Sequence, residues 1–497
     1  MQINLSEALN LFKKGELLKA KNICEEILKK DNNNSEVHNL HGFILYLDKN
    51  FDEAIASWKK AININSNYIE AYNGLGNVFL KLNKLDLAIQ NFEKAIKINP
   101  NYFEAYCNLG SVMIKLEKYQ DAISNFEKAI KIKPNYSQAM YGKAYSLMKN
   151  RNYSDAIIYF NKFTKYNPQN ADAFNAIGSC LISLNKFKDS LNYLIKATDL
   201  QPEHKDAQKN LMNLLKFYQP IEDYPNLTLT LNKKIRSKKF EVNLKNQIID
   251  QKIINYYRKI YEILKEFSSI NNFNEEQIFR RNELILNCDR HFQVFNTFNV
   301  IPEYCFGCYK IQIDLKNILE LFKLHFIFDN LVFERNNIRK TMIETRANVK
   351  GTYKGLIYCS GLDEAKKISN IIEPIIKFNI DKKIKFFIKR GCTEFNLSYP
   401  GFDKTDQSVK YNNDWKDKEK KIDDNYKFEE DTTLKNSISG LNISDALVMK
   451  NWLIYAKKIN DLTYKKFSID ISANDYMEKK MFNQVEFRRN EFSKTKI

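Results

Sequence analysis

A fixed period of 34 residues in the first two fifths of the chain most constrains how the chain can fold. A small residue stands at one position of each period, at Gly42, Gly76, Gly110, Ala144 and Gly178. Alanine stands at a second position, at Ala20, Ala54, Ala88, Ala122 and Ala156, and proline at a third, at Pro100, Pro134, Pro168 and Pro202. Unrelated amphipathic helices do not keep a constant period, so we predict an α solenoid of stacked helix hairpins that bury each other's apolar faces.

Residues 69–102 carry the full pattern of one period. The first half has Tyr72, Leu75, Gly76 and Phe79, and the second half has Ala88, Phe92, Ala95 and Pro100. These offsets resemble the tetratricopeptide repeat, a hairpin of two helices that touch at small residues. The resemblance divides the solenoid into six repeats, at 1–34, 35–68, 69–102, 103–136, 137–170 and 171–204. A closing helix then completes a first domain at 1–218.

In this family the first helix of each hairpin lines a concave groove, so the resemblance implies that an extended peptide of a partner protein lies there. Asparagine amides at groove-facing offsets could pair with a peptide backbone, at Asn39, Asn73, Asn77, Asn108 and Asn175. A second ladder consists of Lys81, Lys115 and Lys149. The alternative is that the asparagines reflect overall composition and the lysines form a solvated edge. Cys107, Tyr141 and Tyr145 interrupt the polar ladder, so we expect an internal peptide segment rather than a free C-terminus.

A chain of 497 residues exceeds a single core, and the period stops near residue 204, so a further folded unit is expected. Lys and Arg outnumber Asp and Glu by 26 to 21 up to residue 204 and by 52 to 39 beyond it, out of totals of 78 and 60. The more basic second part is compatible with an anionic partner or with solubility alone. No apolar run approaches ~20 residues, and the first residues resemble a repeat helix rather than a signal peptide. We therefore expect no membrane span and a cytoplasmic location, where cysteines are thiols or metal ligands.

The second part of the chain alternates between predicted helices and strands. Residues 219–284 are expected to form a helical connector with helices at 243–267 and 275–284. Residues 285–402 are expected to form an α+β domain, with strands at 309–314, 339–347, 352–359 and 383–389 and helices at 315–330 and 362–378. The order βαββαβ is that of the ferredoxin-like fold. A charged linker at 403–433 and a C-terminal helical segment at 434–497, with an amphipathic helix at 443–462, complete the prediction.

Cysteines and one histidine concentrate around the first predicted strand. Cys288 and His291 form a C-x2-H pair, and Cys305 and Cys308 form a C-x2-C pair. In the strand order 4-1-3-2, Cys359 and Cys392 reach the same edge of the sheet, because the start of strand one meets the ends of its neighbours. These residues suit tetrahedral zinc, with an iron–sulfur cluster as the second choice. The sequence does not distinguish a set of four cysteines from the two pairs, nor either of these from ordinary buried cysteines.

The predicted sheet has one face without helices. Alternation assigns to it the basic and aromatic residues Lys310, Lys354, Tyr358, Lys385, Phe387 and Lys389. Such a face fits phosphate contacts and base stacking, and the segment 354–358 is similar to the third strand of an RNA recognition motif. RNA binding is therefore an alternative function.

Familiar catalytic signatures are missing from the sequence, including G-x-S-x-G, H-E-x-x-H and a phosphate-binding glycine loop. We assign no catalytic residue and predict a binding protein, while an enzyme with its site at the cysteines stays a further alternative. The sequence thus predicts an interaction adaptor whose repeats bind a peptide and whose second part carries a metal-binding, cysteine-bearing module.

Overall fold

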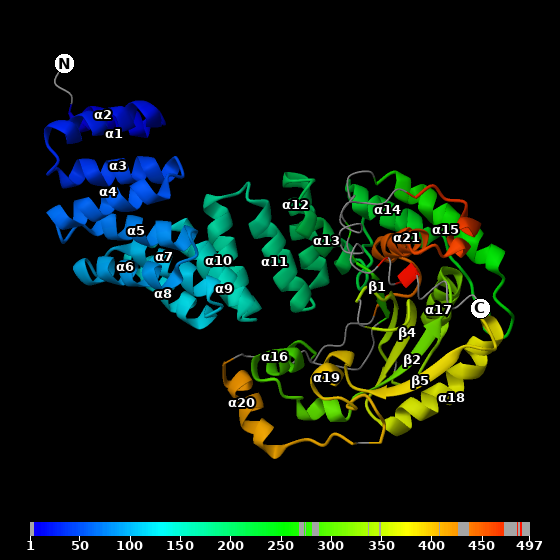
Figure 1. Ribbon diagram of the computed structural model, residues 1–497. Coiled ribbons are helices and arrows are strands. Elements are labelled where there is room, and N and C mark those ends of the chain that lie inside the picture. The colour runs from blue at the N-terminus through cyan, green and yellow to red at the C-terminus, as the bar shows by residue number, and fades with distance from the viewer. Residues whose placement is uncertain are drawn as a thin grey trace. The chain divides into compact units, whose positions relative to one another are not determined.

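The computed structural model describes residues 4–267, 273, 275–280, 288–335, 337–346, 349–406, 408–425, 437–471, 485 and 488–489 (Figure 1). The chain forms two compact units, Met1–Cys180 and Leu181–Ile497. Each unit is described by itself below.

The first unit consists of helix hairpins at the predicted positions (Figure 1). The pairs are α1 (Leu5–Lys13) with α2 (Leu17–Lys30), α3 (Ser35–Leu47) with α4 (Phe51–Ile64), α5 (Ile69–Lys81) with α6 (Leu85–Ile98), α7 (Phe103–Lys115) with α8 (Tyr119–Ile132), and α9 (Ser137–Lys149) with α10 (Tyr153–Tyr166). Helix α11 (Ala171–Ser183) starts the next hairpin at the end of the unit. The predicted helical solenoid is confirmed.

One residue with positive φ turns the chain inside each hairpin. Lys49, Asn83, Glu117 and Arg151 have φ between 58° and 63°, and Gly15 has φ of 78°. In the third hairpin the amide of Lys84 donates to the carbonyl of Phe79, and the amide of Asn83 donates to the carbonyl of Leu80. This pair of bonds is a Schellman motif, which satisfies carbonyls that the helix end would leave without a partner.

Large rings of the second helices pack against the small residues of the first helices. A Cβ atom added at Gly76 would stand 2.4 Å from Cε1 of Phe92, so only a residue without a side chain fits without a shift. Trp58 fills the space at both Gly42 and Gly74, which belong to successive hairpins. The small position of the 34-residue period therefore joins the two helices of one hairpin, and Gly74, two residues before that position, lets Trp58 also contact the next hairpin.

The second unit combines helices with one sheet. Its elements are α12 (Phe187–Leu200), α13 (Lys205–Leu214), α14 (Leu227–Ser237), α15 (Asp250–Lys265), β1 (Gln277–Arg280), α16 (Cys288–Phe298), η1 (Glu303–Phe306), β2 (Tyr309–Leu315), α17 (Ile318–Asn330), β3 (Arg339–Ile343), β4 (Tyr353–Cys359), α18 (Leu362–Asn379), β5 (Lys385–Arg390), α19 (Thr393–Ser398), η2 (Asn413–Trp415), α20 (Lys416–Asn425), α21 (Ile443–Lys458) and η3 (Leu462–Phe467). Among the described residues, no helix combines the length and apolar composition needed to span a membrane.

The sheet has the order β1-β3-β4-β2-β5, and all neighbouring strands are antiparallel. The last four strands pair in the predicted order 4-1-3-2. Strand β1 adds a fifth strand to the described sheet, at the edge of β3, with Gln277 opposite Met342. The helix predicted at 275–284 is therefore wrong over residues 277–280, and residues 281–284 lie outside the described part.

Helices α17 and α18 pack on the sheet and bury one side of it (Figure 1). The side predicted to be open is largely closed too, because Lys310 and Lys354 are only 6% and 3% exposed. The Lys354 Nζ atom lies 3.1 Å from an oxygen of the buried Glu344. Tyr358 is half-buried, whereas Lys385 and Phe387 on the edge strand are exposed. The predicted continuous basic and aromatic surface is thus wrong for the central strands, whose lysines form internal contacts.

Helix α21 lies in the centre of the second unit and contacts α14, α15, α17, β1 and β3. Trp452 donates from Nε1 to the carbonyl of Glu276 at 2.7 Å, and the Tyr455 hydroxyl donates to the carbonyl of Glu344 at 3.1 Å. Nearly every residue from 443 to 456 is buried. The predicted amphipathic helix exists, but it is surrounded by protein instead of presenting a polar face.

Part of the predicted charged linker is folded. Residues 416–425 form α20, and Arg290 of α16 makes ion pairs with Glu419 at 3.0 Å and Asp423 at 2.6 Å. These contacts dock α20 on α16. The prediction of an unstructured segment is wrong there, and residues 426–433 lie outside the described part.

A buried ion cluster joins β1, α17 and α21. The Arg280 guanidinium pairs with Asp329 and, at 3.1 Å, with Asp445. It also lies 3.3 Å from Nε2 of His325, whose Nδ1 is 3.2 Å from the Thr341 hydroxyl. Because a guanidinium can only donate, Nε2 of His325 accepts and Nδ1 carries the proton. Burial, followed by the charge of Arg280, lowers the pKa of His325 to about 4.

Candidate functional site

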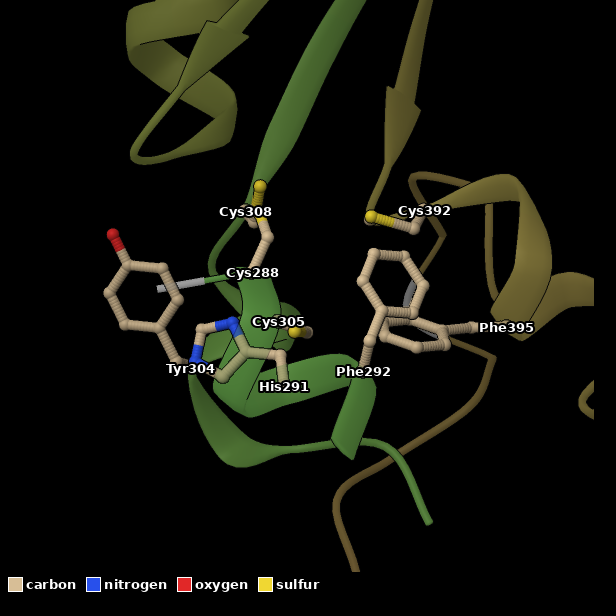
Figure 2. Close-up of a pocket in the computed structure, with 9 residues that line it drawn as sticks. Cys288, His291, Phe292, Tyr304, Cys305, Cys308, Cys392 and Phe395 are labelled. Carbon is tan, nitrogen blue, oxygen red and sulfur yellow. The ribbon is translucent and has the colours of Figure 1, made fainter. Parts of the chain in front are cut away.

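Four cysteines and one histidine line a small cavity in the second unit (Figure 2). The cavity has a volume of about 10 Å³, and its walls are Cys288, His291, Phe292, Tyr304, Cys305, Cys308, Gly391, Cys392 and Phe395. That volume is close to the minimum that holds one water molecule. Five of the six predicted metal-binding residues therefore meet in one place.

Three separate segments bring the cysteines together. Cys288 is the first residue of α16, Cys305 lies in the short helix η1 and Cys308 directly precedes β2. The amide of Cys308 lies 3.4 Å from the carbonyl of Cys305, which closes a tight turn. Cys392 follows β5, the strand that pairs with β2.

A backbone bond ties Cys308 to the segment that carries Cys392. The amide of Gly391 donates to the carbonyl of Cys308 at 2.7 Å. Gly391 has φ of +59°, and a Cβ atom there would stand 2.2 Å from Cε1 of Phe402. Both the backbone conformation and the space require glycine at this position. The sequence Gly391-Cys392 thus lets β5 end next to the start of β2.

Cys359 does not line the cavity. It stands opposite Tyr309 in the β2–β4 ladder, so it shares a face with Tyr309 and not with Cys308, the residue before it. Successive side chains of a strand point to opposite faces of the sheet. Cys359 is completely buried in the core together with Ile357 and Ala365. The edge of the sheet was predicted correctly for this cysteine, but its face was not.

His291 lies at one side of the cavity, beside Tyr304 (Figure 2). The two rings stack with centroids 5.2 Å apart and an interplanar angle of 24°. Burial, followed by the neighbouring charge of Arg290, lowers the pKa of His291 to about 4, although Glu419 and Asp423 act in the opposite direction. The imidazole is therefore neutral at physiological pH.

The thiols of Cys305, Cys308 and Cys392 have raised pKa values. Burial, followed by the neighbouring cysteines, raises the pKa of Cys308 to about 12 and also raises that of Cys305. Burial likewise raises the pKa of Cys392, although Lys310, Lys340 and Arg346 lie near enough to lower it. Activated nucleophiles and redox thiols need a lowered pKa. Burial shifts the pKa values of these three thiols in the opposite direction.

As placed in the described part of the chain, no three His, Cys, Asp or Glu side chains stand in position to bind one metal ion together. The donors line a common wall, but their sulfur and nitrogen atoms do not converge on one point. A metal ion would require the thiols to rotate about their Cα–Cβ bonds.

The asparagines predicted to face a peptide have partners within the first unit. The Asn108 amide donates to Asn73 Oδ1 at 2.8 Å, and Trp58 Nε1 donates to Asn39 Oδ1 at 3.0 Å. Asn73 is only 6% exposed. Asn77 and Asn175 are half-buried. These contacts connect repeats to each other and helices within a repeat, and they involve Oδ1 of Asn39 and Asn73 and the amide nitrogen of Asn108.

The predicted lysine ladder lies on the surface. Lys81, Lys115 and Lys149 are exposed and stand in the last turns of α5, α7 and α9. Lys115 donates to the carbonyl of Leu80, in the preceding repeat, at 3.2 Å, and the Lys149 ammonium lies 5.4 Å from the centre of the Tyr145 ring. The ladder thus offers one exposed ammonium per repeat in three successive repeats.

Family models match much of the first unit. A model described as TPR repeat matches residues 42–83 and 76–117, and two models described as Tetratricopeptide repeat match residues 103–136 and 141–189. Residues 42–189 are therefore tetratricopeptide repeats, as their offsets predicted. A comparison with curated proteins finds no match.

Several solved structures resemble the repeat part. YrrB, a TPR protein with an unusual peptide-binding site, is 25% identical, with a TM-score of 0.34 over 37% of this chain and 96% of YrrB. MamA is 27% identical, with a TM-score of 0.30 over 32% of this chain and 94% of MamA. PilW, a type IV pilus biogenesis factor, is 21% identical, with a TM-score of 0.39 over 41% of this chain and 96% of PilW.

Proposed function

Because residues 42–189 are tetratricopeptide repeats, we propose that this chain is a protein-interaction adaptor whose repeats bind a segment of a partner protein. Solenoids of this kind expose long inner and outer surfaces that a partner can follow from repeat to repeat. In this proposal the partner binds the repeats and leaves the second unit unoccupied.

The lysine ladder is the observation that supports this function best. Lys81, Lys115 and Lys149 are 34 residues apart, so the same corner of three repeats carries the same charge. Ammonium groups on long side chains can adapt to carboxylates of a partner. We therefore assign the ladder to a partner segment that has acidic residues, with affinity and association rate that fall as salt rises.

The asparagines have a supporting role in this proposal. The bonds from Asn108 to Asn73 and from Trp58 to Asn39 keep the first helices at fixed positions. A rigid row of helices reduces the entropy lost when a partner binds. The ladder, rather than the amides, then contacts the partner.

The test reverses the charge of three lysines on the first helices of the hairpins and, in a separate variant, of three lysines on the second helices. The variant Lys81→Glu/Lys115→Glu/Lys149→Glu is compared with Lys97→Glu/Lys131→Glu/Lys165→Glu. The control lysines are also exposed, also 34 residues apart and also in last turns, but on α6, α8 and α10. The tagged full chain is cross-linked and recovered from its own cells, and captured proteins are identified and quantified by mass spectrometry.

We expect the first variant to lose a defined partner by about tenfold or more, in line with the loss of several ion pairs at an interface, and the control variant to keep it. Circular dichroism should show the same helix content for both variants. Equal retention of the partner by both variants would contradict the role of the ladder. Recovery of no repeat-dependent partner from the wild-type chain would contradict the adaptor function.

A further inference from the structure

The cysteine cavity carries an inference that does not depend on the adaptor function. We propose that Cys288, Cys305, Cys308 and Cys392 hold a single zinc ion as four thiolates, and that His291 and Cys359 are not ligands. This set differs from both sets that the sequence left open, because it takes one residue from the C-x2-H pair and omits Cys359.

The first argument is the position of the four sulfur-bearing residues. All four line the same cavity, and they come from the start of α16, the turn before β2 and the end of β5. Structural zinc sites in proteins commonly take two ligands from one C-x2-C turn and two from elsewhere in the fold. Here the Cys305 turn provides the first two, and Cys288 and Cys392 complete the set.

The second argument is the face of the sheet. Strand pairing places Cys359 opposite Tyr309, on the face covered by helices, whereas the cavity lies on the side of Cys308. A side chain cannot cross a sheet to reach the other face without breaking the ladder. Cys359 is therefore a core residue, although its partner in the ladder, Tyr309, directly follows Cys308.

The third argument concerns His291. Its ring is stacked on Tyr304, and the charged groups closest to it are those of Arg290, Glu419 and Asp423. The groups near Cys305 are the other three cavity cysteines, followed by Glu419. Cys305 therefore has the other cysteines as its first neighbours, whereas the ring of His291 is stacked on Tyr304.

Cavity size favours one ion over a cluster. The space of about 10 Å³ fits a particle of the size of one water molecule. A single zinc ion needs no more room, because its four ligand atoms form the wall. An iron–sulfur cluster brings several iron and sulfide atoms of its own and would require the walls to move apart.

The charges around the cavity suit an anionic centre. Lys310 is 6% exposed, and its ammonium donates to the Thr393 hydroxyl at 3.2 Å, next to Cys392. Within the described residues Lys310 makes no ion pair with a carboxylate. Lys340 and Arg346 also lie near Cys392, as does Glu394, with which Arg346 forms an ion pair. A buried cation is costly without an opposite charge, and a zinc ion with four thiolates has a net negative charge.

The test begins with the metal content of the full chain. Protein purified from cells grown with added zinc and iron is analysed by elemental mass spectrometry, and we expect about one zinc ion per chain. A brown protein that contains iron and sulfide, or a chain with no bound metal, would overturn the proposal. The zinc is then replaced with cobalt, whose visible and charge-transfer bands report the number of thiolate ligands. A spectrum of fewer than four thiolates would also overturn it.

Single substitutions identify the ligands. Cys288→Ser and Cys392→Ser should retain about tenfold less zinc than the wild type in competition with a chelator, because each removes one bond to the metal. Cys359→Ser is the matched control, since it changes a buried cysteine at the same sheet edge but on the other face. His291→Asn is the second control. Metal loss in Cys359→Ser equal to that in Cys392→Ser, or a shifted cobalt spectrum in His291→Asn, would contradict the ligand set.

A measurement on the wild type covers the case in which the serine variants do not fold. The full chain is alkylated with iodoacetamide with zinc bound and after the zinc is removed with a chelator, and modified cysteines are located by mass spectrometry. We expect Cys288, Cys305, Cys308 and Cys392 to become reactive only after zinc removal, while Cys24, Cys107, Cys180 and Cys359 do not change. Protection of a different set by zinc would overturn the assignment.

Discussion

Phe92 in the first unit and Phe322 in the second are both fully buried, but they connect different amounts of the chain. The Phe92 ring packs against Gly76, a residue of the same hairpin. The Phe322 ring contacts Tyr257, Trp452 and Phe467, which come from α15, α21 and η3. In the first unit the ring holds a residue of its own hairpin, and in the second unit it holds segments 65, 130 and 145 positions away along the chain.

The two units should therefore differ in how cooperatively they unfold. Repeats interact with their nearest neighbours, so a solenoid can lose one repeat and keep others. The second unit has no such subdivision, because α21 contacts helices and strands that precede it by more than 100 residues. We therefore expect local damage in the first unit and damage to the whole structure in the second.

Phe322→Ala and Phe92→Ala test this contrast directly, and they should have the largest effects. Each substitution removes a buried ring and should lower the free energy of unfolding by about 3–5 kcal/mol. Hydrogen exchange followed by mass spectrometry should show faster exchange across α15, α17, α21 and β2–β4 in Phe322→Ala. In Phe92→Ala the faster exchange should stay within α5–α8. Equal acceleration of α1–α2 in Phe92→Ala would contradict the proposed local behaviour.

Arg280→Met should be nearly as damaging. The substitution leaves Asp329 and Asp445 buried without their cation, and breaking a buried ion pair in this way costs about 3–5 kcal/mol. Urea unfolding followed by the fluorescence of the buried Trp452 should show a lower midpoint. The triple variant Arg280→Met/Asp329→Asn/Asp445→Asn removes all three charges and should recover part of the loss. No recovery would indicate that hydrogen bonds, rather than charge, hold the cluster.

Acid should weaken the second unit through His325, with an intermediate effect. The pKa of His325 is about 4 in the folded chain, below its ordinary value of 6.5. Above pH 6.5 the imidazole is neutral in both states, and stability is unaffected. Between pH 6.5 and 4 the unfolded chain binds the proton more readily, so stability falls, by about 2 kcal/mol at pH 5. Below pH 4 the imidazole of His325 is protonated in both states, so it causes no further loss of stability.

His325→Gln isolates that contribution. Glutamine can accept from Arg280 and donate to Thr341 as the neutral imidazole does, but it does not titrate. Urea midpoints of the wild type and the variant are compared at pH 7.5 and pH 5. The wild type should lose more stability than the variant. Equal losses would assign the acid sensitivity to other groups.

Adding one methyl group to a glycine should give the smallest effects. A Cβ atom at Gly355 would stand 2.3 Å from Leu324, and one at Gly76 would stand 2.4 Å from Phe92. The fifth repeat already has Ala144 at the position equivalent to Gly76, with Phe160 in place of Phe92. We expect Gly355→Ala to cost about 1–3 kcal/mol through overpacking and Gly76→Ala to cost less than about 1 kcal/mol, since the gain in helix propensity offsets part of the strain. Thermal unfolding of the two variants compares their losses of stability. A larger loss in Gly76→Ala than in Gly355→Ala would contradict this expectation.

The sequence predicted the two units unequally well, because the contacts that form them span different sequence separations. The helices of the repeats were predicted because the small residue and the ring that it receives lie within one 34-residue period, as for Gly76 and Phe92. Strands β2, β4 and β5 alternate clearly and were also predicted. Strand β1 was missed because its four residues pair with β3, which lies 59 to 65 positions later in the sequence.

The candidate site shows the same limit at the level of single residues. The sheet order brought Cys308 and Cys392 to one edge correctly, because the start of β2 and the end of β5 meet in any antiparallel pair. Cys359 was misplaced because the prediction followed strand ends and not the alternation of faces, a signal that Tyr309 and Ile357 already contained in the sequence. The surroundings of His291 could not be predicted, since they include Tyr304 and α20, a helix in a segment that appeared to be a linker.

The central position of α21 has a consequence for how the protein is made. Chain growth proceeds at about 5–20 residues per second, and N-terminal domains fold as they emerge. Each repeat can dock on its predecessor soon after it leaves the ribosome. Strands β2–β5 must instead wait for residues 443–458 before their unit can close, and they carry apolar side chains throughout that delay. We therefore expect the half-made second unit to expose the most apolar surface during synthesis.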